Sequence, residues 1–158
     1  MTSENANLIL PGLWLGNRVA AADTAFLTSH GIKTVFNCTK QLPFDPSVTR
    51  QYRVPVDDNL EPAEIANLER WAPEILYKLV AEYKAGHPVL VHCHAGMQRS
   101  AAVVAMFLIA IFRKPTDYVV QYIRQRRGIA FFPAINFEPA IRGFEARYLP
   151  MYKHATQG

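Results

Sequence analysis

Residues 88–112 of this 158-residue chain read PVLVHCHAGMQRSAAVVAMFLIAIF. The apolar run at 88–91 is typical of a buried strand, and the longer run at 101–112 is typical of a buried helix. The nine residues between them, 92–100, predict a tight loop that closes on the helix N-terminus. A strand, a loop and a helix in direct succession indicate an α/β domain.

This loop combines a thiol with groups that bind anions. Backbone N–H groups at the start of a helix form an anion site together with the helix dipole. The same field stabilises a thiolate at Cys93. Arg99 carries a planar guanidinium that can bind two oxygens of a phosphate, and Gly96 lets the backbone turn inward. The spacing therefore predicts a nucleophile and a phosphate clamp around one centre.

The rest of the chain alternates between strand and helix patterns and ends in helices. Pro73 lies inside a long helical pattern and predicts a kink or a restart there. Strands followed by helices predict an α/β fold whose sheet is covered on both faces, with the 92–100 loop at the carboxyl end of a central strand. The expected strands are 8–10, 13–16, 32–38, 51–56 and 88–92, and the expected helices are 20–29, 61–84, 101–112, 115–127 and 136–148.

Length and composition favour one globular domain with its own core, since half of the residues are hydrophobic. No apolar run approaches the ~20 residues of a membrane span, and residues 1–7 lack the features of a signal peptide. The two cysteines do not make a disulfide framework, so a reducing compartment is expected. We therefore expect an intracellular, cytoplasmic protein without membrane attachment.

The formal charge of +4 is modest and suits a phosphorylated partner. Nucleic-acid binding usually shows a denser basic stripe with interleaved aromatic residues, so no nucleic acid is expected. The densest basic run is RQRR at 124–127, which we interpret as compensation of a helix dipole. No pattern in the sequence predicts an oligomeric state.

The stretch His-Cys-x-x-Gly-x-x-Arg-Ser at 92–100 resembles the signature of cysteine-dependent protein phosphatases, and the short chain is similar to their dual-specificity branch. The similarity extends from residue 8 to 149. The resemblance implies the compact protein tyrosine phosphatase-like fold, with a mixed, largely parallel sheet flanked by helices. It also implies one catalytic domain at 8–150 with short tails at 1–7 and 151–158. Further matching segments are LWLGN at 13–17, HGIKTVFN at 30–37 and RVPVDD at 53–58.

The resemblance implies roles for individual residues. Cys93 is the nucleophile that forms a phosphocysteine, and the hydroxyl of Ser100 donates to its sulfur. Asp58 falls at the position of the general acid, whereas its neighbour Asp57 is expected to be a surface turn residue. No metal or other cofactor is implied, because the aspartates and histidines lack metal-ligand spacing. The phosphate-binding loop comprises His94, Ala95, Gly96, Met97, Gln98 and Arg99.

Three further residues have open roles. His92 either orients the loop through its imidazole or is a packed core residue. Cys38 either forms a reversible disulfide with Cys93, as in some relatives, or is a small buried hydrophobe. Many relatives carry an Asn that braces the loop where this chain has Ala134, so either Asn136 takes over this bracing or the loop is held differently.

The predicted activity is hydrolysis of phosphotyrosine and phosphoserine/threonine in protein substrates. A second interpretation keeps the chemistry and changes the substrate to a phosphoinositide or an RNA 5′-phosphate. The variable loop positions 94, 95, 97 and 98 carry no lysine, which disfavours inositides, and Ser100 stands where RNA-directed relatives tend to have threonine. A third interpretation is a non-catalytic phospho-binding module, although Cys93, Arg99 and Asp58 are all present.

Overall fold

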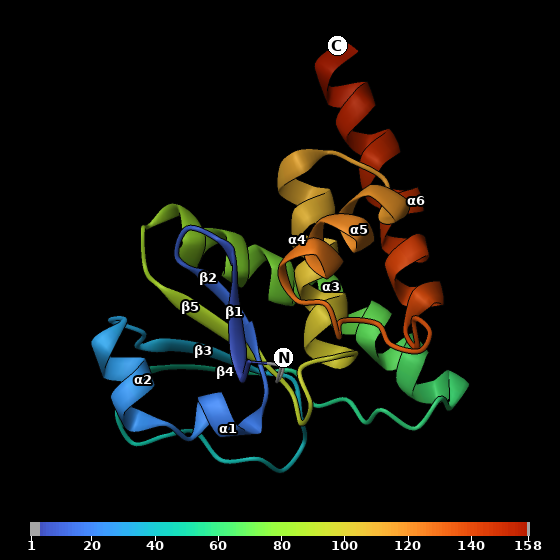
Figure 1. Ribbon diagram of the computed structural model, residues 1–158. Coiled ribbons are helices and arrows are strands. Elements are labelled where there is room, and N and C mark those ends of the chain that lie inside the picture. The colour runs from blue at the N-terminus through green and yellow to red at the C-terminus, as the bar shows by residue number, and fades with distance from the viewer. Residues whose placement is uncertain (1–3, 158) are drawn as a thin grey trace.

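The computed structural model describes residues 4–157, with side chains described through residue 151 (Figure 1). The strands are β1 (Ala6–Leu10), β2 (Leu13–Gly16), β3 (Thr34–Asn37), β4 (Arg50–Arg53) and β5 (Val89–His92). The helices are α1 (Arg18–Ala21), α2 (Thr24–Ser29), α3 (Pro62–Lys84), α4 (Arg99–Phe112), α5 (Thr116–Arg126) and α6 (Glu138–Gln157).

The strands form one sheet in the order β1-β2-β5-β3-β4. β1 and β2 are antiparallel, and the other neighbours are parallel. The register pairs Gly16 with His92, His92 with Asn37, and Asn37 with Arg53. The carboxyl ends of four strands therefore stand in one row. The segments that follow these strands meet at the end of the sheet where α/β proteins bind ligands.

Two hydrophobic clusters lie on opposite faces of the sheet. Because strand side chains alternate between faces, Leu90 belongs to one cluster and its neighbours Val89 and Val91 belong to the other. Helices α1 and α2 cover the face of Leu90, and helices α3 to α6 pack on the opposite side (Figure 1). This arrangement confirms the predicted α/β fold with helices on both faces.

Helix α4 lies in the middle of the larger helical layer. Every residue from Arg99 to Ile109 is buried, as expected for a helix that is apolar on nearly all sides. It contacts α3, α5, α6 and β5. Because α4 begins directly after the 92–98 segment, the loop is anchored between a buried strand and a buried helix.

The helix predicted at 20–29 is divided into α1 and α2. The side chain of Asn17 accepts hydrogen bonds from the N–H groups of Val19 (2.9 Å) and Ala20 (3.1 Å), and it begins α1. The side chain of Asp23 accepts from the N–H of Phe26 at 3.0 Å and begins α2. Each cap satisfies N–H groups that a helix start leaves free, so the chain starts a helix twice within seven residues.

Other boundaries differ less. Helix α3 continues through Pro73 as a single helix, and β4 ends at Arg53, before the predicted end of that strand. The predicted tails are partly structured, because β1 begins at Ala6 and α6 extends to Gln157; residues 1–3 and 158 lie outside the described residues. Among the described helices, none combines the length and apolar character needed to cross a bilayer.

Candidate active site

Cys93 is the first residue after β5, and only 2% of its surface is exposed. Its Sγ lies 3.0 Å from the Oγ of Ser100, in the first turn of α4. A hydroxyl at this distance can donate to a thiolate and stabilise its charge. The structure therefore brings together the predicted nucleophile and the serine that was expected to assist it.

A buried arginine binds two backbone carbonyls of the loop. Arg127 is 1% exposed, and its guanidinium donates to the carbonyls of Gly96 (2.8 Å) and Ala95 (3.2 Å). The same group donates to the carbonyl of Glu4 and the side chain of Asn7, both at 2.8 Å. Burial lowers the pKa of Arg127, and negative charge on Cys93 opposes this effect. The guanidinium therefore also attracts a thiolate in the loop.

Two backbone donors bind the neighbouring loop carbonyls. The N–H of Arg18 donates to the carbonyl of His94 (3.1 Å), and the N–H of Phe131 donates to that of Met97 (2.8 Å). A trans peptide points its N–H away from its carbonyl, so the N–H groups of residues 95–98 face the inside of the loop. Within the described residues, these four N–H groups have no protein acceptor. They form a set of donors suited to an anion.

Gly96 is required at its position. Its φ of +68° lies in the left-handed region that favours glycine. A Cβ atom there would stand 2.5 Å from the carbonyl oxygen of Gly16 and 2.7 Å from Nη2 of Arg127. The close approach of the loop to β2 and to Arg127 therefore excludes any side chain.

Arg99 connects the loop to the segment that carries the aspartates. It is 9% exposed, and its Nη1 donates to the carbonyl of Val56 at 3.0 Å. Its buried Nε has no hydrogen-bond partner in the described part of the chain. A planar guanidinium in this position keeps N–H donors that can bind two oxygens of one phosphate.

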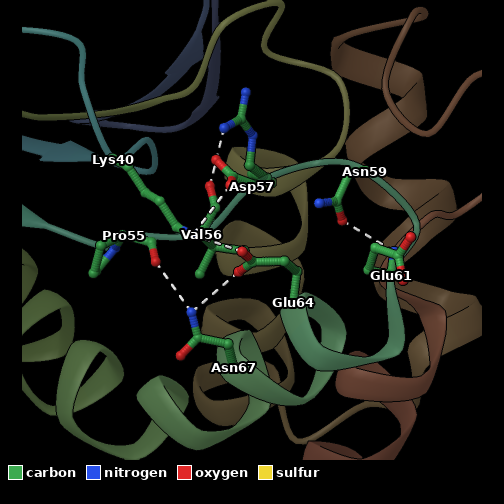
Figure 2. Close-up of polar contacts among 9 residues, drawn as sticks. Lys40, Pro55, Val56, Asp57, Asn59, Glu61, Glu64 and Asn67 are labelled. Carbon is green, nitrogen blue, oxygen red and sulfur yellow. Dashed lines mark hydrogen bonds and ion pairs between the residues drawn. The ribbon is translucent and has the colours of Figure 1, made fainter.

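The segment after β4 is held by an ion-pair network (Figure 2). The Nζ of Lys40 lies 3.0 Å from Oδ2 of Asp57 and 2.6 Å from Oε2 of Glu64. Asn67, on α3, donates to the carbonyl of Pro55 at 3.1 Å. Glu64 and, to a lesser extent, Asp57 raise the pKa of Lys40. Asp57 thus belongs to a structural ion pair, beyond the surface turn role expected for it.

Asp58 contacts a different part of the structure. It is exposed, and its Oδ1 accepts a hydrogen bond from Nδ2 of Asn136 at 2.9 Å. The backbone N–H of Asn136 donates to Oε1 of Gln98 at 2.9 Å, and Nε2 of Gln98 donates to the carbonyls of Ala134 (2.8 Å) and Phe132 (3.2 Å). Gln98 is a residue of the loop itself. The expected acid is therefore connected to the loop through Asn136 and Gln98.

His92 is 1% exposed, and its Nδ1 lies 3.3 Å from the carbonyl oxygen of Cys93. Its Nε2 has no hydrogen-bond partner among the described residues. Burial lowers the pKa of His92 to about 4, so the imidazole is neutral near pH 7. A role in orienting the loop stays a prediction.

Cys38 and His94 are two further residues near Cys93 with predicted roles. The N–H of Cys38 donates to the carbonyl of His92 at 2.8 Å, and both cysteines are free thiols. Burial, followed by the charge of Cys93, raises the pKa of Cys38 well above its ordinary value.

His94 is exposed, with Nδ1 3.4 Å from Nη1 of Arg18. Among residues 4–151, whose side chains the structure describes, no group of three or more His, Cys, Asp or Glu is arranged to hold a metal.

Comparison with known proteins agrees with this geometry. Residues 13–147 match the family model of the dual specificity phosphatase catalytic domain. The chain belongs to the dual-specificity phosphatase family. It is 30% identical to human dual specificity protein phosphatase 1 over 95% of this chain and 40% of the relative, and 32% identical to mouse dual specificity protein phosphatase 2 over 89% and 43%. This phosphatase domain thus spans about two fifths of the length of these curated relatives.

Solved structures support the same assignment of the phosphatase domain. A mouse putative dual specificity phosphatase, complexed with zinc tungstate, superposes with a TM-score of 0.80 at 28% identity, covering 96% of both chains. The human tyrosine phosphatase-like serine/threonine/tyrosine-interacting protein superposes with a TM-score of 0.79 at 29% identity, covering 91% of this chain and 97% of that one. The family fold therefore extends over nearly the whole domain.

Two functional residues were not found from the sequence. The interpretation of RQRR at 124–127 as dipole compensation is wrong for Arg127, which lies beyond the end of α5 and points into the protein. Gln98 was expected only as a member of the loop, without its link to the 132–136 segment. The signal that was present is the glycine directly after Arg127, because a glycine that follows a helix places the residue before it at the cap, where its side chain can turn away from the helix.

We predict that Arg127→Met lowers the free energy of unfolding by about 3 kcal/mol, because it leaves two buried loop carbonyls unsatisfied. The affinity of the Arg127→Met variant for orthovanadate should also fall by at least about tenfold, since the loop N–H groups lose their orientation. Urea unfolding and vanadate titration measure the two effects. The control is Arg126→Met, an exposed neighbour whose guanidinium contacts, among the described residues, only the ring and carbonyl of Tyr122, and it should change stability by less than about 1 kcal/mol. Equal stability and affinity in both variants would contradict the role of Arg127.

The buried His92 predicts a pH dependence of stability. Its pKa is about 4 in the folded chain and ~6.5 in the unfolded chain. As the pH falls, the unfolded chain therefore takes up a proton at His92 before the folded chain does. The stabilisation is complete above pH ~6.5 and is lost as pH falls towards 4, by on the order of 3 kcal/mol. In His92→Asn, the free energy of unfolding should lose this dependence on pH. Urea unfolding at several pH values between 4 and ~6.5 measures it. An unchanged slope in the variant would count against a neutral, buried His92.

Proposed function

We propose that this domain is a cysteine-dependent phosphatase that hydrolyses phosphotyrosine and phosphoserine/threonine in phosphorylated proteins. The observation that carries the proposal is the set of inward-facing N–H groups at residues 95–98, in the loop that begins with the Cys93 thiol. A nucleophile inside an anion site is suited to attack a bound phosphoryl group. Arg99 adds a buried positive charge at the end of the same loop.

In the first step, the Cys93 thiolate attacks phosphorus, and the bond from phosphorus to the leaving oxygen breaks. Asp58 gives its proton to that oxygen, and a phosphocysteine forms. In the second step, water attacks the phosphocysteine and Asp58 takes the proton from water. Inorganic phosphate leaves, and the thiolate is restored. The Ser100 hydroxyl, 3.0 Å from the sulfur, stabilises the thiolate in both steps.

The contacts of the two aspartates support Asp58 as the acid. Asp57 is bound to the ammonium group of Lys40, which also binds Glu64. Asp58 contacts the neutral amide of Asn136 and is exposed to solvent, so its proton can exchange with water. Through Asn136, Asp58 is connected to the loop that holds the phosphate, which favours a fixed distance between acid and nucleophile.

The alternative substrates are less well supported. A phosphoinositide carries several phosphates, and the exposed loop positions His94 and Ala95 offer no fixed positive charge for them. For an RNA 5′-phosphate, Ser100 stands where RNA-directed relatives tend to have threonine. A phospho-binding module would not need a thiol, so the retained Cys93 favours catalysis. A working thiol also requires a reducing environment, which supports a cytoplasmic location.

A reversible disulfide between Cys38 and Cys93 stays part of the proposal. A peroxide would oxidise Cys93 to a sulfenic acid, and the Cys38 thiol would displace water from it. Both thiols are buried, and the ends of their strands are joined by the hydrogen bond from Cys38 to His92. This reaction would protect the nucleophile from irreversible oxidation.

We predict that Cys93→Ser abolishes phosphate release from a peptide carrying phosphothreonine and phosphotyrosine, and that it still binds the peptide. The serine hydroxyl remains protonated near pH 7, whereas the loop donors that bind the phosphate are retained. Mass spectrometry of the products shows which phosphate leaves. The wild-type domain should remove both, and substantial turnover by Cys93→Ser would remove Cys93 from its role. Release of phosphotyrosine alone would indicate a deeper pocket.

We predict that Asp58→Asn lowers kcat for an aryl or alkyl phosphate by about 10²–10⁴-fold, the usual contribution of a general acid. The matched variant Asp57→Asn removes an adjacent carboxylate and should lower kcat much less. Steady-state rates on the phosphothreonine peptide measure the difference, because an alkyl leaving group needs the proton most. A larger loss in Asp57→Asn than in Asp58→Asn would move the acid to Asp57.

A further inference from the structure

Arg18 lies beside the phosphate-binding loop, on the side away from the acid. Arg18 follows β2 and the Asp58 segment follows β4, and β5, which leads into the loop, lies between these strands in the sheet. The side chain of Arg18 reaches the residue after the nucleophile. Its Nη1 donates to the carbonyl of His94 at 3.3 Å, in addition to the bond from its backbone N–H.

The charge of Arg18 is not neutralised by a neighbour. Within residues 4–157, no carboxylate forms an ion pair with its guanidinium. The carboxylates of Asp23 and Asp45 also line the adjacent cavity, but their hydrogen bonds go to other groups. Asp23 accepts from the N–H of Phe26, and Asp45 accepts from the hydroxyls of Thr24 (2.8 Å) and Ser47 (2.6 Å). A guanidinium has five N–H donors, so exposed Arg18 keeps donors for an anion from solution.

A cavity of about 700 Å³ opens next to Arg18, between α1 and the segment that follows β3. It is open on one side, and His92 forms part of its wall. Much of the rest of the lining is apolar: Val19, Leu42, Pro43 and Phe44. A cationic group at the rim of an apolar cavity is suited to an acidic residue whose neighbour is apolar.

We propose that Arg18 and this cavity form a second subsite for the substrate. It binds a carboxylate or a phosphate on a residue within two positions of the phosphorylated residue, and an adjacent apolar side chain enters the cavity. The proposal rests on the proposed function, because the substrate must already be bound in the Cys93 loop. Arg18 follows β2 and therefore lies on one side of β5 and the loop, so the preference applies to one flank of the peptide.

The test compares phosphotyrosine peptides that differ at one position. The positions one and two residues before and after the phosphotyrosine carry alanine, glutamate or phosphothreonine in turn. For the wild-type domain, kcat/KM should be about fivefold to tenfold higher for the acidic peptides than for the alanine peptides on one flank, as for one charge-assisted contact at a partly exposed site. This ratio should fall to near one in Arg18→Gln, and it should shrink as ionic strength rises.

Lys84→Gln is the matched control. It removes the same charge from the exposed end of α3, at the opposite end of the sheet, and should keep the wild-type ratio. A wild-type ratio near one, or an unchanged ratio in Arg18→Gln, would overturn the subsite. The affinities of the same peptides are measured in parallel for Cys93→Ser with and without Arg18→Gln. If the wild-type domain releases no phosphate, the proposed function fails, whereas these affinities still decide on the subsite.

Discussion

The orientation of four peptide groups is the constraint on which the active site depends. An anion can be bound by backbone N–H groups only if the matching carbonyls are held away from it, since both belong to the same rigid peptide units. Here the carbonyls of residues 94–97 are bound by the N–H of Arg18, the guanidinium of Arg127 and the N–H of Phe131. Arg127 is the central element, because it binds two carbonyls and also donates to the side chain of Asn7 on β1.

The sheet brings the parts of the site together. Gly16, Asn37, Arg53 and His92 end four strands in one row, and each is followed by a segment with a different contribution. The segment after β5 supplies Cys93, the proposed nucleophile, and the segment after β4 supplies the two aspartates. The segment after β3 supplies Lys40, and the segment after β2 supplies the start of α1. The segment between α5 and α6 adds two links, from Arg127 to the loop and from Asn136 to Asp58, the proposed acid.

The strand–loop–helix unit and the α/β fold were predicted from the sequence, because they depend on apolar runs and on the spacing of loop residues. Both are visible among residues that are close together in the chain. The division into α1 and α2 was missed because two short caps, at Asn17 and Asp23, outweigh a weak helical pattern. Arg127 was missed because its partners lie more than 30 residues away in sequence. The two alternatives for Asn136 both stay predictions: Arg127 binds two loop carbonyls, whereas Asn136 donates its backbone N–H to Gln98 of the loop and its side chain to Asp58.

The most direct test of this account is to detect the covalent intermediate. The wild-type domain is mixed with excess aryl phosphate, quenched in acid within one turnover, digested and analysed by mass spectrometry. The account predicts one added phosphoryl group on the peptide that contains Cys93, formed at least as fast as phosphate is released. Phosphate release without this adduct, or an adduct on another residue, would contradict the claim that the loop holds Cys93 as the nucleophile.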